Sequence, residues 1–126
     1  MQRERSKISV IIPTLEEEEY IEAILSRLKT VKPTVEIIVV DGGSHDKTVA
    51  LARKFTNKVF QTVKRGIAVG RNYGAKKAKG DILLFMDTDV RFHKDFVKKI
   101  QNAFNDPAVV GATCNIMPLS DNPIEK

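Results

Sequence analysis

Two aspartates, Asp87 and Asp89, follow five consecutive apolar residues in the stretch DILLFMDTDV (81–90). If the backbone stays extended there, both side chains point to the same side, with Cα atoms roughly 6.5 Å apart. Mg²⁺ and Mn²⁺ prefer oxygen ligands and keep waters and substrate phosphates in their shell, so two such carboxylates can hold either ion. We therefore predict an Mn²⁺ or Mg²⁺ site at this pair. The alternative is a strand-ending turn in which one aspartate caps the next helix.

Polar residues also end two other apolar segments. Pro13 and Thr14 follow the run ISVII, and Asp41 follows the run EIIVV. In an open parallel sheet, ligands bind at the carboxyl ends of the strands, so we expect these residues and the aspartate pair to share one rim. A fixed carboxylate at Asp41 could accept a hydrogen bond from the N–H edge of a nucleobase.

The loops after these segments have simpler structural interpretations as well. Thr14 could be a helix N-cap with Glu17 as its capping-box partner, and a negative charge suits a helix N-terminus. In DGGSHDKT (41–48) the glycines allow a tight turn, and Ser44 or Asp46 could cap the following helix. The glycines at 66, 70 and 74 fall near one helix face and favour close packing of that helix.

The elements that must position these groups alternate along the chain, which predicts an α/β fold. Nearly continuous apolar runs are typical of strands covered on both faces, as in a parallel sheet. We predict a Rossmann-like, mainly parallel sheet with helices on both faces, a three-layer α/β/α arrangement. The expected strands are 8–13, 35–41, 58–63, 81–87 and 108–114, and the expected helices are 16–30, 46–56, 66–79 and 94–104.

Composition limits the class of protein. The 126 residues suffice for one domain, and a single cysteine, Cys114, excludes an internal disulfide framework. No apolar run approaches the roughly 20 residues of a membrane-spanning helix, and the N-terminus does not look like a secretory signal. We expect a cytoplasmic protein, with the cytoplasmic face of a membrane as a second possible place.

Charge is unevenly distributed along the chain. Residues 53–99 carry 13 basic and 4 acidic side chains, a net +9, whereas the flanking segments 1–52 and 100–126 are each −2. One interpretation is solvated lysines on helix faces. The other is attraction to an anionic ligand or to an anionic membrane surface. Nucleic acid is not an expected partner, because the chain has no Trp and few aromatic residues to stack on bases.

Three stretches in order, SVIIPTLEEEEYI, EIIVVDGGSHDKT and GRNYGAKKAKGDILLFMDTDV, resemble the N-terminal half of the family 2 glycosyltransferases. The resemblance covers about residues 7–92. It implies the GT-A fold, a UDP- or GDP-sugar donor and metal-assisted, inverting transfer of the sugar to an acceptor hydroxyl. The acceptor is unknown, and a lipid phosphate or a polysaccharide would suit the family.

The resemblance also implies roles for the residues near the first two strands. Pro13, Thr14 and Glu17 match the loop that lines the nucleotide pocket. Asp41 matches the acid that reads the base, although this chain has one acid where the family often has two.

Further along the chain, Arg71 and Asn72 match the Arg-Asn pair that approaches the nucleotide. Asp87 and Asp89 match the Asp-x-Asp motif that holds the metal on the diphosphate. By the same resemblance, residues 1–126 form one nucleotide-diphospho-sugar-binding domain of a longer enzyme, and the catalytic base lies beyond Lys126.

Other functions remain open at this point. The chain could be a non-catalytic nucleotide-sugar-binding fragment. A nucleotidyltransferase of similar fold would normally carry a glycine-rich basic loop after the first strand, where this chain has PTLEEEEY. A phosphoryl-accepting receiver domain would need a lysine near Cys114 and Asn115, which is missing.

Overall fold

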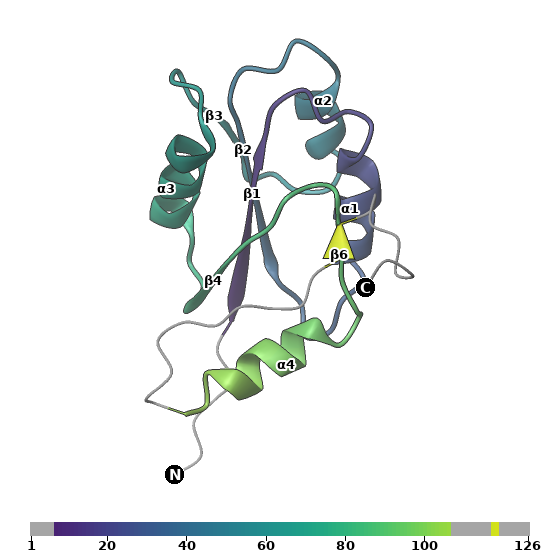
Figure 1. The fold of residues 1–126 in the computed structure, drawn as a ribbon, viewed down its shortest axis with the longest axis vertical. Coiled ribbons are helices and arrows are strands. Elements are labelled where there is room, and N and C mark those ends of the chain that lie inside the picture. The colour runs from purple at the N-terminus through teal and green to yellow at the C-terminus, as the bar shows by residue number, and fades with distance from the viewer. Residues whose placement is uncertain (1–6, 107–116, 119–126) are drawn as a thin grey trace.

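The centre of the fold is a four-stranded parallel sheet with strand order β3-β2-β1-β4 (Figure 1). The computed structural model describes residues 7–106 and 117–118. β1 spans Ile8–Thr14, β2 Glu36–Asp41, β3 Val59–Gln61 and β4 Ile82–Phe85. Every residue of β2, and every residue of β1 except Pro13, is buried. This two-sided burial explains why the apolar runs of these strands do not alternate with polar residues.

Helices cover both faces of this sheet. They are α1 (Ile21–Leu28), α2 (Thr48–Ala52), α3 (Ile67–Lys77) and α4 (Phe96–Ala103). The main core joins α1, α2 and α4 to one face of β1 and β2, and a smaller core under α3 forms on the other face. Figure 1 shows α3 across the sheet from α1 and α2. The predicted three-layer α/β/α arrangement is confirmed.

α3 approaches the sheet unusually closely because two of its residues lack a side chain. A Cβ atom added to Gly74 would lie 2.4 Å from Ile11 Cγ2, and one added to Gly70 would lie 3.1 Å from Pro13 Cβ. The first distance leaves no room for a Cβ atom and the second would be a tight contact, so these glycines permit the close packing expected from their spacing. Gly66 differs, because it precedes the helix and has a φ of 132°.

Several boundaries differ from the sequence prediction. α1 begins at Ile21 with Tyr20 at its N-cap, so the capping box of Thr14 and Glu17 is wrong. β4 ends at Phe85, so the backbone is not extended through Asp89. The physical reason in both places is tertiary, because the loops after β1 and β4 are held by side chains from elsewhere in the fold.

Two elements near the chain end complete the description. The short strand β5 (Val90–Arg91) pairs antiparallel with β6 (Met117–Pro118), a pairing that the sequence did not predict. The strand expected at 108–114 lies outside the described residues. Within the described part of the chain, no helix is both long and apolar enough to cross a membrane.

At the amino ends of the strands, the buried carboxylate of Glu36 joins several segments. It accepts hydrogen bonds from Ser9 Oγ (2.5 Å), from the backbone N–H of Lys79 (2.8 Å) and from the ammonium of Lys58. Burial acts to raise the pKa of Glu36, but these hydrogen bonds and the charge of Lys58 outweigh it and lower the pKa to about 2. Glu36 therefore stays ionised and ties β1, β2 and the α3–β4 connection together.

Candidate functional site

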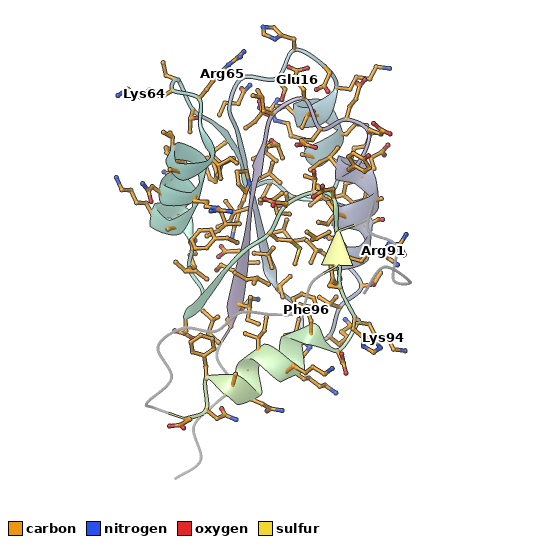
Figure 2. The ribbon with its side chains drawn as sticks, in the orientation of Figure 1. Glu16, Lys64, Arg65, Arg91, Lys94 and Phe96 are labelled. Carbon is orange, nitrogen blue, oxygen red and sulfur yellow. The ribbon has the colours of Figure 1, made fainter. Side chains whose placement is uncertain are left out.

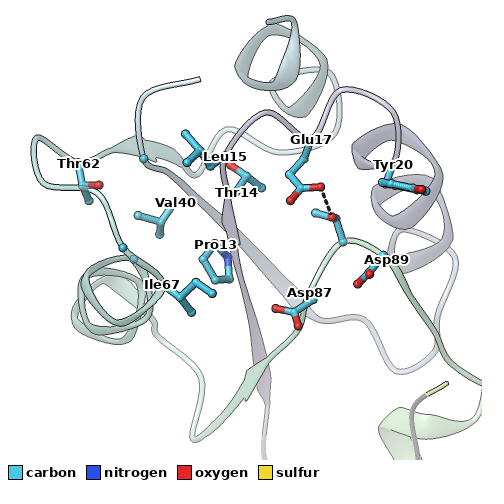
Figure 3. A pocket seen from close by; sticks show the side chains of 14 residues that line it. Pro13, Thr14, Leu15, Glu17, Tyr20, Val40, Thr62, Ile67, Asp87 and Asp89 are labelled. Carbon is cyan, nitrogen blue, oxygen red and sulfur yellow. Dashed lines mark hydrogen bonds between the residues drawn. The ribbon is translucent and has the colours of Figure 1, made fainter. Parts of the chain in front are cut away.

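A cavity of about 420 Å³ opens at the carboxyl ends of β1, β2 and β4, the edge at which ligands were expected (Figure 3). This volume lies within the usual range for small-molecule sites. The residues that line it come from the loops after these strands and from the start of α3: Pro13, Thr14, Leu15, Glu17, Tyr20, Val40, Gly42, Thr62, Gly66, Ile67, Gly70, Asp87, Thr88 and Asp89. Five residues predicted from the sequence therefore border one cavity.

The two sides of this cavity differ in chemistry. Leu15, Val40 and Ile67 contribute apolar side chains on the side of β2 and α3 (Figure 3). On the other side, the turn after β4 contributes the carboxylates of Asp87 and Asp89. Such a cavity suits a ligand with an apolar or aromatic part at one end and a charged part at the other.

A hydrogen bond from Thr88 to Glu17 crosses from the turn after β4 to the loop after β1. Thr88 Oγ1 donates to Glu17 Oε2 at 2.7 Å, and the threonine is only 3% exposed. The backbone N–H of Glu17 in turn donates to Thr48 Oγ1 at 2.8 Å. Because Thr88 points inward, its neighbours Asp87 and Asp89 are left exposed at the cavity on either side of it (Figure 3).

Asp87 and Asp89 could supply part of the coordination shell of a metal ion. Both are exposed, both line the cavity, and neither carboxylate makes a hydrogen bond or ion pair to the described part of the chain. The described residues contain no group of three or more His, Cys, Asp or Glu side chains that could hold a metal. The pair fits Mg²⁺ or Mn²⁺, which need only one or two carboxylates when water and phosphate complete the shell.

Asp41 is fully buried, and its carboxylate is occupied by protein donors. Oδ1 accepts from Thr14 Oγ1 (2.7 Å) and Ser44 Oγ (2.6 Å), and Oδ2 accepts from the backbone N–H groups of Gly43 (3.0 Å) and Ser44 (2.7 Å). Asp41 thus fixes the turn after β2 and does not line the cavity. A direct contact with a nucleobase would require some of these four bonds to open.

The four glutamates 16–19 lie in the loop before α1, and two of them accept hydrogen bonds from the loop after β2. His45 N–H donates to Glu16 Oε1, and Lys47 N–H donates to Glu18 Oε1 at 3.0 Å. In the reverse direction, the backbone N–H of Glu16 donates to Ser44 Oγ at 2.7 Å. These reciprocal bonds hold the two loops together along one edge of the cavity.

Asp46 strengthens this joint between the loops. Its carboxylate accepts hydrogen bonds from the hydroxyl and backbone N–H of Thr48 and from the backbone N–H of Glu18. Desolvation acts to raise the pKa of Asp46, but the hydrogen bonds outweigh it and hold the pKa below its ordinary value. Asp46 therefore bonds the first N–H group of α2, as the sequence suggested, without being the N-cap residue.

Arg71 and Asn72 are not among the residues that line the cavity. Both are exposed on α3, and the guanidinium of Arg71 lies 5.8 Å from the centroid of the Phe85 ring. The cation therefore lies beside the exposed edge of β4. Their contact with a nucleotide stays a prediction.

Sequence reasoning missed Tyr20 and Ile67 as cavity residues. It placed Thr88 at this rim together with the two aspartates, but it gave the threonine no role, because its hydrogen-bond partner Glu17 is distant in the sequence. Tyr20 and Ile67 stand in helical patterns whose apolar residues were expected to face the core. Only the packing of α1 and α3 places these two side chains at the cavity.

The sequence of the chain matches the model of glycosyl transferase family 2 over residues 9–125. The chain belongs to this family. An uncharacterised glycosyltransferase of Bacillus subtilis is 39% identical over 100 residues, which cover 74% of this chain and 26% of that protein. This chain thus spans about a quarter of the length of that relative. The family assignment does not support the receiver-domain or nucleotidyltransferase alternatives.

Solved structures of family members show the same fold. The Staphylococcus aureus poly(ribitol-phosphate) β-N-acetylglucosaminyltransferase TarS (1–349), solved with UDP, matches with a TM-score of 0.72 and 32% identity, over 79% of this chain and 32% of that one. The mannosyltransferase PcManGT of Pyrobaculum calidifontis, solved with GDP-Man and Mn²⁺, matches with a TM-score of 0.71 and 25% identity, over 85% and 34%. The expected GT-A fold is confirmed.

Proposed function

We propose that this chain binds the nucleotide-sugar donor of a glycosyltransferase that transfers a sugar to an acceptor hydroxyl. The observation that carries the proposal is the cavity at the carboxyl ends of the strands. It has apolar side chains on one side and, on the other, the carboxylates of Asp87 and Asp89, which have no partner among the described residues. The base and ribose of the donor lie against Leu15, Val40 and Ile67. Its diphosphate lies toward the aspartates.

A divalent cation, Mg²⁺ or Mn²⁺, belongs to this proposal. Asp87 and Asp89 would hold it, and when bound it offsets the negative charge of the departing nucleoside diphosphate. Two bare carboxylates next to a diphosphate would otherwise repel it. The crystal structure of PcManGT with GDP-Man and Mn²⁺ supports this part of the proposal by likeness.

The residues around the aspartates act by position. The Thr88–Glu17 hydrogen bond holds the acidic turn against the loop after β1, and Asp41 fixes the turn after β2 through its four bonds. Holding reactants in a productive geometry can contribute roughly 7–11 kcal/mol to catalysis in well-oriented cases. We propose that these contacts contribute to that positioning.

The acceptor side of the reaction is also part of the proposal. A general base would deprotonate the acceptor hydroxyl for in-line displacement at the sugar carbon, with inversion. We assign this base to no residue of the described chain. A lipid phosphate or a polysaccharide is the proposed class of acceptor, in a cytoplasmic setting with peripheral contact to an anionic membrane surface.

A melting experiment tests donor binding. The 126-residue chain is heated with UDP or GDP, each with and without Mn²⁺, and with Mn²⁺ and pyrophosphate as the control that lacks a nucleoside. A ligand at 100 times its Kd should add about 2.7 kcal/mol of stability. We expect stabilisation by at least one nucleoside diphosphate, larger with Mn²⁺ and larger than with pyrophosphate. No shift with either nucleotide would contradict the proposal.

A non-catalytic nucleotide-sugar-binding role is the second candidate. It is favoured because no described residue has been assigned as the catalytic base. Incubation of the chain with a UDP- or GDP-sugar and Mn²⁺, followed by measurement of donor hydrolysis, distinguishes the two roles, because a binding module would hold the donor without consuming it.

A further inference from the structure

All the charged side chains of segment 62–80 are basic. The segment contains the loop before α3, α3 itself and the first residues after it. It carries six cationic side chains and no Asp or Glu. All six cationic residues are exposed: Lys64, Arg65, Arg71, Lys76, Lys77 and Lys79. Among the described residues none of them forms an ion pair with a carboxylate. This one segment accounts for much of the positive charge of the middle of the chain.

Apolar side chains lie exposed at the N-terminal end of α3, close in sequence to Lys64 and Arg65. Val63 is 103% exposed and Ile67 is 61% exposed, and they flank Lys64 and Arg65 in the sequence. Figure 2 shows Lys64 and Arg65 at one end of the molecule, with Lys94 near the opposite end. A fully exposed valine beside two cations gains nothing from contact with the fold. The same arrangement can place apolar groups into a lipid interface while the cations meet anionic headgroups.

The N-terminal end of α3 lies beside the proposed donor cavity. Thr62, Gly66 and Ile67, on either side of the basic tip, line the proposed donor cavity. A bilayer that contacts Val63 and Lys64 would therefore lie beside the cavity mouth. An acceptor carried on a lipid would meet the donor there without leaving the membrane.

We infer that the exposed residues Val63, Lys64, Arg65, Arg71 and Lys76, the α3 patch, form a docking surface for an anionic lipid bilayer. This inference deepens the proposed function by naming the surface that would meet a lipid-linked acceptor. Each Lys or Arg near an anionic lipid surface strengthens binding about fivefold, which corresponds to about 1 kcal/mol. Three or four such contacts give a weak, reversible association that salt reduces.

Two features of the surroundings bear on the choice of partner. The acids Glu16 and Glu18 lie on the neighbouring loop, and their carboxylates accept backbone N–H groups of His45 and Lys47. Glu16 lies at the same end of the molecule as Arg65 (Figure 2), but neither acid forms an ion pair with Lys64 or Arg65 among the described residues. Nucleic acid fits the patch less well, because single-strand binding relies on exposed aromatic rings. The half-buried ring of Tyr73 lies under the ammonium of Lys77, 5.5 Å from its centroid.

Vesicle sedimentation tests the inference. The 126-residue chain is mixed, without nucleotide, with vesicles of phosphatidylcholine alone or with about one third phosphatidylglycerol. The variant K64E/K76E reverses two charges on the patch, and K94E/K98E makes the same change in charge at the α4 end. We expect binding to the anionic vesicles only, a loss of more than tenfold in K64E/K76E, and a change of less than about threefold in K94E/K98E. V63D should weaken binding while Val63→Thr largely preserves it.

Equal losses in K64E/K76E and K94E/K98E would overturn the inference, because binding would then follow net charge rather than a surface. Equal binding to phosphatidylcholine alone would also overturn it. So would tighter binding of a short single-stranded RNA at the same salt concentration. Nucleotide-dependent melting of K64E/K76E separates the two proposals, because a retained shift with lost vesicle binding shows an intact donor cavity, and no shift in any variant contradicts the donor proposal alone.

Discussion

Thr88 Oγ1 lies 2.7 Å from Glu17 Oε2 and donates a hydrogen bond that joins two loops 71 residues apart in the sequence. The threonine between the two aspartates is thereby buried against the loop after β1, and the aspartates remain exposed at the cavity. This contact couples the acidic turn to the rest of the cavity wall. We therefore expect its removal to lower both ligand affinity and the stability of the fold.

Replacing Thr88 by valine keeps the shape of the side chain and removes the donor. A hydrogen bond to a charged acceptor contributes about 1.5–3 kcal/mol to the stability of the arrangement that it holds. If ligand binding needs the acidic turn in this position, T88V should weaken Mn²⁺-dependent UDP or GDP binding by up to roughly tenfold or more. T88S restores the hydroxyl and should recover most of the affinity. Calorimetric titration measures this. If both variants lower the melting temperature without changing nucleotide affinity, Thr88 has a structural role only.

Asp89→Asn removes one charge from the proposed metal site and keeps its size. Loss of a supporting contact to a metal commonly costs 10–100-fold in affinity, so loss of a ligand should cost at least tenfold. Without metal the variant should be as stable as the wild type or slightly more stable, because repulsion from Asp87 is relieved. Glu19→Gln, an exposed acid outside the cavity lining, is the matched control. Unfolding of D89N without metal would show that Asp89 is a structural residue.

Gly74→Ala tests the close packing of α3. The added Cβ would lie 2.4 Å from Ile11 Cγ2, and Ile11 is fully buried and cannot move aside freely. Overpacking costs about 1–3 kcal/mol, whereas the gain in helix propensity is at most about 1 kcal/mol. We therefore expect a net loss of about 1–2 kcal/mol in urea unfolding. Gly42→Ala, whose Cβ would lie no closer than 3.7 Å to other atoms, should change stability little.

Glu36→Gln tests the buried carboxylate at the other end of the sheet. The pKa of Glu36 falls from an ordinary 4.5 to about 2 in the folded chain, so its ionised form favours folding. That stability is fully present above pH 4.5 and is lost as the pH falls toward 2. E36Q should lose on the order of 2–3 kcal/mol at pH 7, and its unfolding free energy should depend less on pH in this window.

The control for Glu36 is an exposed ion pair. Glu22 and Lys54 lie 3.9 Å apart on the surface, and exposed pairs typically contribute less than about 1 kcal/mol. Glu22→Gln should therefore leave the pH dependence of unfolding almost unchanged. Parallel pH profiles for the wild type and E36Q would contradict the assignment of the pKa shift to Glu36.

The amino-acid sequence determined the layers of the fold and the edge at which the cavity lies. Long apolar runs in β1 and β2 can only be buried on both faces, and the spacing of Ile21, Ile24, Leu25 and Leu28 can only bury one helix face. Once the strands are parallel, their carboxyl ends meet at one edge. Local periodicity carries this information, which is why Pro13, Thr14, Asp87 and Asp89 could be placed at this edge from the sequence. The place of Glu17 in the pocket loop came from the resemblance to the family.

Only the tertiary structure decided where α1 begins, where β4 ends and which polar groups face the cavity. Thr14 was expected to cap a helix, but its hydroxyl donates to Asp41 instead, and Asp41 is buried away from the cavity. β4 ends at Phe85, and Thr88 in the turn that follows donates to Glu17, 71 residues away in the sequence. Each of these outcomes is a competition between a local partner and one that is distant in the sequence. A hydrogen-bond partner that is near in the sequence can be recognised from the sequence itself. A distant partner can be recognised only in the folded chain, after the strands have paired.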